Sequence, residues 1–241
     1  ATLPMMDDGL NGDGEAGDGV FGAIVPAQPE GALVRYRIDA AGPTGTMGTP
    51  RDDDTVQWVG TYLAPATSSG LDVFHWLIEP DAYERALQHV YTDLTEPALL
   101  FQGGRLYDGV QVRVRGQSSR GWPKKHWNFK FAPGHPFADP AYLPAPVNGF
   151  NLQSSYADKS YLREILSYET FQAAGSPSHV IAPVAVHQNG AFFGLYGFLE
   201  DADDAYLERN GLDPEGGFYK AFGSQCTYDP ELPLEGPWEK E

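Results

Sequence analysis

The sequence predicts an α+β fold made mainly of antiparallel sheet, and three observations support this prediction. Short runs of alternating apolar and polar residues recur along the chain, bounded by turns that contain glycine or proline. The Asn189-Gly190 pair lies between two such runs and is a strong signal for a β-hairpin. One long helical pattern, at 158–175, follows several strands without alternating with them, and this segregation is typical of α+β domains.

The first 55 residues are expected to form the C-terminal part of a β-sandwich. Alternating runs at 19–27 and 31–42 predict strands between Gly- and Asp-rich turns. The Pro/Gly/Thr-rich stretch at 42–54 ends in three aspartates and predicts a domain boundary near residue 55. Because a full sandwich has about seven strands, this piece is expected to contain only the last of them.

Residues 56–241 are expected to form the second domain, in which strands surround the long helix. A helix is predicted at 79–91, where Pro80 and Asp81 suit a first turn. The helix at 158–175 should bury one broad apolar face and end at Gly175. We predict a short acidic helix at 201–211, and strands at 55–63, 72–79, 98–108, 110–116, 126–132, 149–155, 179–188, 191–200 and 216–222.

Composition excludes several functional classes. Asp and Glu number 33 against 16 Lys and Arg, and the resulting charge of −17 argues against binding to nucleic acid, which needs a positive footprint. No apolar stretch approaches the roughly 20 residues of a membrane-spanning helix. Cys226 is the only cysteine, so an intramolecular disulfide and a cysteine-based zinc site are excluded.

One segment departs from this acidity. Residues 109–138 contain six cations and no acidic residue. Arg113 and Arg115 share one face of a predicted strand, the Gly-Gln-Ser-Ser-Arg-Gly turn at 116–121 offers hydroxyls and backbone N–H groups to an anion, and the strand at 126–132 returns from it. The arrangement predicts a phosphate site, whereas a solvated or partner-binding basic surface is the ordinary alternative.

The long helix and the first turn of the chain supply further candidates. Glu164 can hold a strand lysine as the helix glutamate does in protein kinases, although a single helix glutamate is more often an ordinary surface charge. Asp158 suits an N-cap or a first-turn acid.

The Asp/Gly-rich segment at 7–20 offers oxygen ligands of the kind that calcium prefers, and the candidates are Asp7, Asn11, Asp13 and Asp18. An EF-hand is excluded because Gly9 and Val20 fall on its first and last ligand positions. A hairpin loop without metal is the alternative interpretation.

Four stretches, in order, resemble the CotH kinase family. They are VRVRGQSSRGWPKKHWNFKF, NGFNLQSSYADKSYLREILSYETFQAAG, APVAVHQNGAFFGLYGFLED and GGFYKA, and the resemblance covers roughly residues 95–221. The N-terminal piece is similar to the end of an Ig-like or fibronectin-like sandwich. The family resemblance implies an atypical protein-kinase N-lobe, of mostly antiparallel sheet plus one long helix, and the start of a C-lobe.

The same resemblance implies function. It implies ATP binding with Mg²⁺ and phosphorylation of Ser or Thr in secreted or surface proteins of bacteria, with an extracellular or cell-surface location, as for a spore coat. By it, the turn from Arg115 to Ser119 covers the phosphates, Lys125 or Lys130 binds them, and 194–200 forms the hinge. The implied nucleotide-binding residues are Arg113, Arg115, Gln117, Ser118, Ser119, Lys125, Lys130, Glu164 and Glu200.

The chain departs from the family in one respect. The family places its catalytic and metal-binding aspartates in a segment of W-D-x-D character, and no such segment occurs in these 241 residues. We therefore expect the C-lobe to be incomplete, the catalytic residues to stay unknown and this chain alone to be inactive. The alternative function is a non-catalytic surface-assembly or adhesion module whose basic hairpin docks an acidic partner. Carbohydrate binding through Tyr107, Trp122 and Trp127 is a weaker hypothesis, since strand alternation turns Trp127 towards the core.

Overall fold

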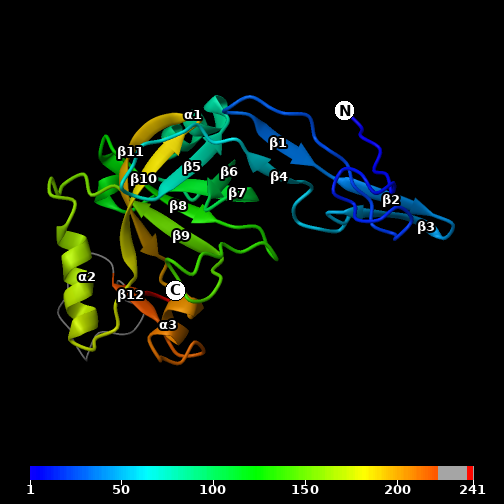
Figure 1. The fold of residues 1–241 in the computed structure, drawn as a ribbon. Helices are drawn as coiled ribbons and strands as arrows, with labels where there is room; N and C mark the ends of the chain where they lie inside the picture. The colour runs from blue at the N-terminus through cyan, green and yellow to red at the C-terminus, as the bar shows by residue number, and fades with distance from the viewer. Residues whose placement is uncertain (222–237, 241) are drawn as a thin grey trace.

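The computed structural model describes residues 1–221 and 238–240, so Cys226 and the last residue of the predicted strand at 216–222 lie outside the described part. Within the described residues, seven strands close into a barrel in the order β10-β11-β9-β8-β7-β6-β5 (Figure 1). All neighbours are antiparallel except β10 and β5, which run parallel and close the barrel. The barrel strands are β5 (Val73–Ile78), β6 (Glu96–Gln102), β7 (Arg105–Arg115), β8 (His126–Lys130), β9 (Gly149–Gln153), β10 (Ile181–Gln188) and β11 (Ala191–Glu200).

The barrel interior holds an aromatic core. Alternation along the strands turns every second side chain inwards. Trp76 and Trp127 meet with ring centroids 4.7 Å apart, and Phe129 stacks on Phe150 at 5.2 Å. All four of these side chains are fully buried. Trp127 and Tyr107 belong to this core, which removes two of the three aromatic residues considered for carbohydrate.

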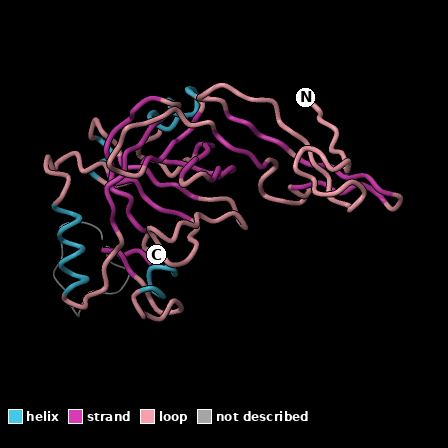
Figure 2. Tube along the Cα trace, viewed as in Figure 1, coloured by secondary structure: helices cyan, strands magenta, loops and turns pink. Residues whose placement is uncertain are grey.

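Helices cover the barrel only in part. Pro80 opens α1 (Pro80–Gln88) at the predicted place, and Ala82 and Ala86 bury its inner face against the core. A short helix, α3 (Asp204–Arg209), follows β11. Beyond it β12 (Tyr219–Ala221) pairs with β13 (Trp238–Lys240). This mixed but predominantly β architecture confirms the predicted α+β class (Figure 2).

The long helix begins later than predicted. α2 (Arg163–Ala173) starts five residues after the beginning of the 158–175 pattern. The Asp158 carboxylate accepts from the backbone N–H groups of Ser160 and Arg163, and Tyr161 takes a left-handed φ of 59°, so this stretch forms a capping turn. At the other end Gly175, with φ of 75°, stops the helix as predicted.

The apolar face of α2 is not buried as predicted. Leu162, Leu166 and Phe171 are each about half exposed, at 51%, 55% and 51%, and none of the α2 residues is fully buried. Ile165 and Tyr168 are half-buried. Figure 1 shows α2 standing to one side of the barrel, and this position explains why a helix-period pattern alone overestimated its burial.

The N-terminal region contains two small sheets. β1 (Leu33–Tyr36) pairs with β4 (Val59–Tyr62), and β2 (Ile38–Gly42) pairs with β3 (Gly45–Thr49). The predicted strand at 19–27 is wrong, since an isolated bridge at Gly22 is its only pairing among the described residues. An alternating pattern forms a strand only where a partner strand supplies hydrogen bonds. The predicted boundary at 55/56 stays a prediction.

No helix in the described part of the chain is long and apolar enough to cross a membrane.

Candidate functional site

The outer face of β7, β8 and β9 is polar, and it forms the floor of the candidate site. Cross-strand register places Arg115 opposite His126, and Arg113 opposite Asn128. Asn128 in turn lies opposite Asn151 of β9. Since the intervening residues fill the aromatic core, the alternation predicted for β8 is confirmed, although His126 and Asn128 are themselves buried.

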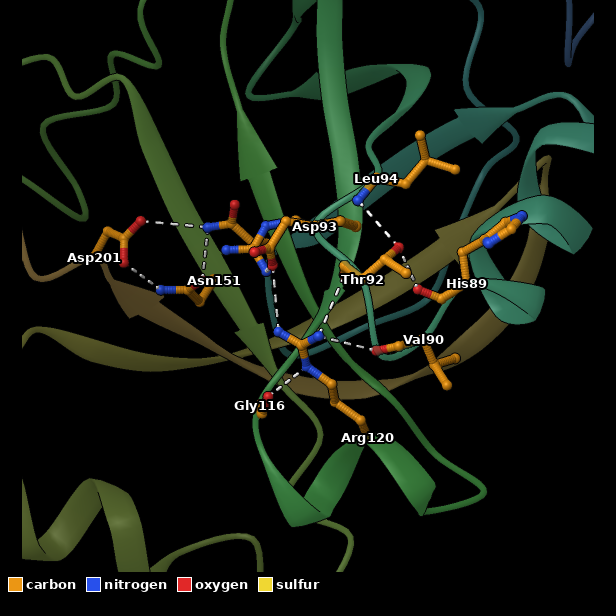
Figure 3. Close-up of polar contacts among 11 residues, drawn as sticks. His89, Val90, Thr92, Asp93, Leu94, Gly116, Arg120, Asn151 and Asp201 are labelled. Carbon is orange, nitrogen blue, oxygen red and sulfur yellow. Dashed lines mark hydrogen bonds and ion pairs between the residues drawn. The ribbon is translucent and has the colours of Figure 1, made fainter. Parts of the chain in front are cut away.

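An amide network joins this floor to the segment after β11. Asn128 Nδ2 donates to Asn151 Oδ1 at 2.9 Å, and Asn151 Nδ2 donates to Asp201 Oδ1 at 3.0 Å (Figure 3). Asp201 Oδ2 also accepts from Asn128, at 3.3 Å. Asp201, the first residue of the helix predicted at 201–211, therefore anchors the chain to the sheet and lies outside α3. Asp203 caps α3 by accepting from the backbone N–H of Tyr206.

The 116–121 turn is held rigidly over one end of the floor. Gly116 has a φ of 108°, and a Cβ atom at this position would lie 2.1 Å from Ser119 Oγ, so the turn requires glycine here. Arg120 donates to the carbonyls of Gly116, Val90 and Thr92 (Figure 3). One guanidinium thus ties the turn to itself and to the segment that follows α1.

A cleft of about 370 Å³ opens between this turn, the sheet and the start of α2. The predicted residues Ser118, Ser119 and Glu164 meet there, although they are far apart in sequence. Gln117, the second residue of the turn, is exposed and does not line the cleft. The cleft is lined by Ser118, Ser119, Trp122, His126, Gln153, Ser155, Tyr156, Ala157, Asp158 and Glu164.

Glu164 faces the sheet as predicted, but its partner is an amide. Gln153 Nε2 donates to Glu164 Oε1 at 3.0 Å. Burial raises the pKa of Glu164, and the nearby positive charge of Arg115 opposes that shift. Lys130, the partner that the family resemblance suggested, lies outside this cleft. Gln153 was not singled out in the sequence, although its two-residue spacing from Asn151 places both on one strand face.

Three cations of the basic segment contact a surface carboxylate or backbone carbonyl oxygens. Arg113 Nη1 pairs with Asp93 at 2.9 Å, and Arg120 makes the turn contacts described above. Lys125 Nζ donates to the Arg120 carbonyl at 2.7 Å, outside the 370 Å³ cleft. These side chains support the fold of the hairpin, and their positive charge is largely engaged within the molecule.

A fourth cation, Lys124, is half-buried in a cage of two carbonyl oxygens and two tyrosine rings. Its Nζ donates to the carbonyls of Ser154 and Leu195 and lies over the rings of Tyr161 and Tyr196, at 4.8 Å and 4.3 Å from their centroids. Burial lowers the pKa of Lys124 to about 8, and the charge of Lys159 adds to the effect. No local sequence signal distinguishes this lysine from Lys125, because its partners come from β11, from the residue after β9 and from the turn before α2.

The two remaining cations have different environments. Lys130 is exposed and lines a second cleft of about 420 Å³ beside Asp201, Asp204 and Glu208. Arg115 lies on the floor of the site, opposite His126. Lys130 therefore lines a different cleft from Ser118, Ser119 and Glu164, with which the family resemblance grouped it.

Glu200 lies at the end of β11 but does not face the floor. It is 2% exposed and pairs with Arg209 of α3, with Oε1 2.7 Å from Arg209 Nε. Its other oxygen accepts from the backbone N–H of Val180 at 3.0 Å. This buried pair holds α3 against the barrel.

In the N-terminal Asp/Gly-rich loop, the carboxylates bind backbone. Asp7 accepts from Gly17 and Gly19 N–H groups, and Asp13 Oδ2 accepts from Asp8 and Gly9. The carboxylate of Asp18 accepts from Glu15 and Val20 N–H groups, and Asn11 takes a left-handed φ of 59°. The described residues contain no group of three or more His, Cys, Asp or Glu side chains placed to hold a metal ion. Calcium binding by this loop stays a prediction.

The buried histidine of the floor predicts a pH dependence. His126 Nδ1 accepts from the Ser154 N–H at 2.9 Å, and burial, assisted by the charges of Arg115 and Lys124, lowers the pKa of His126 to about 4. The unfolded chain binds this proton near its ordinary pKa of 6.5. The contribution of His126 to the free energy of unfolding is therefore fully present above about pH 6.5. It is lost as the pH drops towards 4, and the loss is at most about 3 kcal/mol.

Urea unfolding of the wild type and His126→Gln at pH 7 and pH 4.5 tests this expectation. Gln keeps an acceptor for Ser154 but has no proton to gain, so the variant should lose less stability than the wild type on acidification. Equal losses in the two proteins would contradict the assignment, because His75 and His179, whose pKa values burial also lowers, contribute equally to both.

Comparison with known proteins relates two parts of the chain to known families. Residues 112–239, more than half of the chain, match the model of the family described as CotH kinase protein. Residues 1–46 match the family described as Conditioned medium factor 2nd Ig-like domain, which confirms the Ig-like character expected of the N-terminal piece. The chain is 25% identical over 154 residues to Inner spore coat protein H of Bacillus subtilis (strain 168). That match covers 63% of this chain and 40% of the relative, so the chain spans less than half of the relative's length.

Proposed function

The chain belongs to the CotH kinase protein family, and from that premise we propose that it binds ATP against the outer face of β7, β8 and β9. The phosphates would lie beneath the 116–121 turn, in the cleft that Ser118, Ser119 and Glu164 share. The hydroxyls and backbone N–H groups of this turn are donors suited to phosphate oxygens.

The order of the elements is the observation that carries this proposal. In protein kinases a glycine-rich loop covers the phosphates, a lysine on the third strand contacts them, and a glutamate of the next helix pairs with that lysine. Here the 116–121 turn joins β7 to β8, and β9 is the third strand when counted from β7. The helix α2 follows β9, and Glu164 of α2 is turned towards that strand. The kinase-like N-lobe is accordingly part of the proposal, with Gln153 at the strand position that contacts the helix glutamate.

The described residues fit the phosphates of the nucleotide and not its metal. Magnesium bound with a nucleotide commonly uses one or two carboxylates of the protein. Asp158 and Glu164 are the carboxylates of the cleft, but Asp158 caps the start of α2 and Glu164 is bonded to Gln153. The role of this chain's residues is therefore to bind and orient the nucleotide, and no phosphoryl-transfer step is assigned to them.

The proposal for the whole protein is broader. The whole protein would phosphorylate Ser or Thr residues of secreted or surface proteins, at a bacterial surface or spore coat. This proposal rests on the family and on the spore-coat relative. The alternative of an adhesion module with a basic docking hairpin is less well supported. Arg113, Arg120, Lys124 and Lys125 are bonded within the molecule, and so little free charge remains for an acidic partner.

Calorimetric titration of ATP with Mg²⁺ tests the nucleotide proposal. The wild type should bind, and Ser119→Glu should weaken binding at least tenfold, because it places a negative charge where the phosphates would lie. Ser68→Glu, in an exposed loop away from the cleft, is the matched control and should bind like the wild type. Absence of binding by the wild type, or equal binding by Ser119→Glu, would refute the proposal.

A further inference from the structure

Arg115 is the one cation of the basic segment that is partly buried and has neither an ion pair nor a hydrogen bond from its side chain in the described part of the chain. The ion pairs of the described residues do not include it. Its Nη1 atom is closed to solvent and has no hydrogen-bond partner. Asp201 and Glu164 lie near enough to act on its charge, yet neither contacts it.

A guanidinium in this state is energetically costly. Burial lowers the pKa of Arg115, and the neighbouring charge of Arg113 acts in the same direction. Burying a charge without a bonded partner opposes folding, and native structures keep such groups chiefly where a ligand, water or ion completes them. The group is therefore better explained by an anion that binds there than by a structural role.

The surroundings of Arg115 indicate which anion fits. Its cross-strand neighbour His126 lines the cleft, and the turn that begins at Gly116 contributes Ser118 and Ser119 to the same cleft. Arg115 as a whole remains partly exposed next to these cleft residues, while its Nη1 atom is closed to solvent. A planar guanidinium binds two phosphate oxygens at once, which an ammonium group cannot do.

We propose that Arg115 is the phosphate-binding cation of this site, in the role that a strand lysine has in protein kinases. This inference rests on the proposed nucleotide function and assigns to Arg115 the contact that the family resemblance gave to Lys125 or Lys130. Lys125 is bonded to the Arg120 carbonyl, and Lys130 belongs to the second cleft with its acidic lining.

Titrations with two ligands separate this inference from the nucleotide proposal. ATP with Mg²⁺ and inorganic triphosphate are each titrated into the wild type, Arg115→Gln, Arg115→Lys and Lys130→Gln. Arg115→Gln should lower the affinity for both ligands at least thirtyfold. Arg115→Lys should lower it five- to tenfold, because the lysine keeps the charge but cannot contact two phosphate oxygens at once. Arg105→Gln, at the exposed start of the same strand, is the matched control and should change neither affinity more than twofold.

The outcomes discriminate between the two ideas. ATP binding that survives in Arg115→Gln overturns the role of Arg115 and leaves the nucleotide function standing. Loss of ATP binding in Lys130→Gln alone would assign the phosphate contact to that lysine. Triphosphate binding that depends on Arg115, without ATP binding, supports the anion site and refutes the nucleotide. A wild type that binds neither ligand refutes both. If Arg115→Gln fails to fold by circular dichroism, Arg115→Lys carries the test.

Discussion

Arg209→Met is expected to lower the free energy of unfolding by about 3–5 kcal/mol, since it strands the Glu200 carboxylate in the interior. Glu200 is 2% exposed, and Arg209 bonds both of its oxygens, at 2.7 and 2.5 Å, while also donating to the Ser178 carbonyl. Removal of one partner of such a buried pair leaves a charge without compensation. Urea denaturation at pH 7 measures the loss.

A double-mutant cycle sharpens this expectation. Arg209→Met combined with Glu200→Leu should cost less than the sum of the two single changes, because the double variant buries no lone charge. Arg163→Met is the matched control, since Arg163 is an exposed arginine 3.7 Å from Asp158, and it should change stability by less than about 1 kcal/mol. If the losses of stability in Arg209→Met and Glu200→Leu simply add in the double variant, the two side chains are not coupled as the structure indicates.

Lys124→Ala is expected to destabilise the protein by about 2–4 kcal/mol. The change removes charge-assisted hydrogen bonds to the Ser154 and Leu195 carbonyls and a cation held over two tyrosine rings. It also releases the segment before β8 from the residue that follows β9 and from β11. Thermal and urea unfolding of the variant give the magnitude.

The adjacent lysine provides the control for this prediction. Lys125 makes one hydrogen bond, to the Arg120 carbonyl, so Lys125→Ala should cost less than about 1.5 kcal/mol. The two variants remove the same side chain and the same charge from neighbouring positions. Similar losses in both would mean that the cage around Lys124 contributes little.

Much of the fold could be predicted from local chemistry. Asn189 and Gly190 adopt left-handed φ values of 49° and 85° at the predicted hairpin turn, and Gly175 ends α2 where expected. Pro80 opens α1, and alternation along β8 sent Trp127 and Phe129 into the core. Each of these outcomes depends on residues within a few positions of one another.

Other features depended on partners that no pattern reveals. Barrel closure pairs His75 of β5 with His187 of β10, which are more than a hundred residues apart. The alternating stretch at 19–27 formed no strand, and the apolar side of α2 stayed largely exposed. Periodicity indicates which side chains can be buried together, but only the fold determines what they pack against.

The candidate site divides in the same way. The order of residues predicts an acid-free basic segment with a Gly-Gln-Ser-Ser turn, and it places Glu164 on a helix beyond the third of three consecutive strands. Which cations remain available depends on contacts between distant segments. Lys124 receives its partners from 154 and 195, and Arg113 from Asp93, whereas Arg115 receives none within the described residues. The reason is physical: charge is encoded residue by residue, but its neutralisation depends on distances that exist only once distant strands have met.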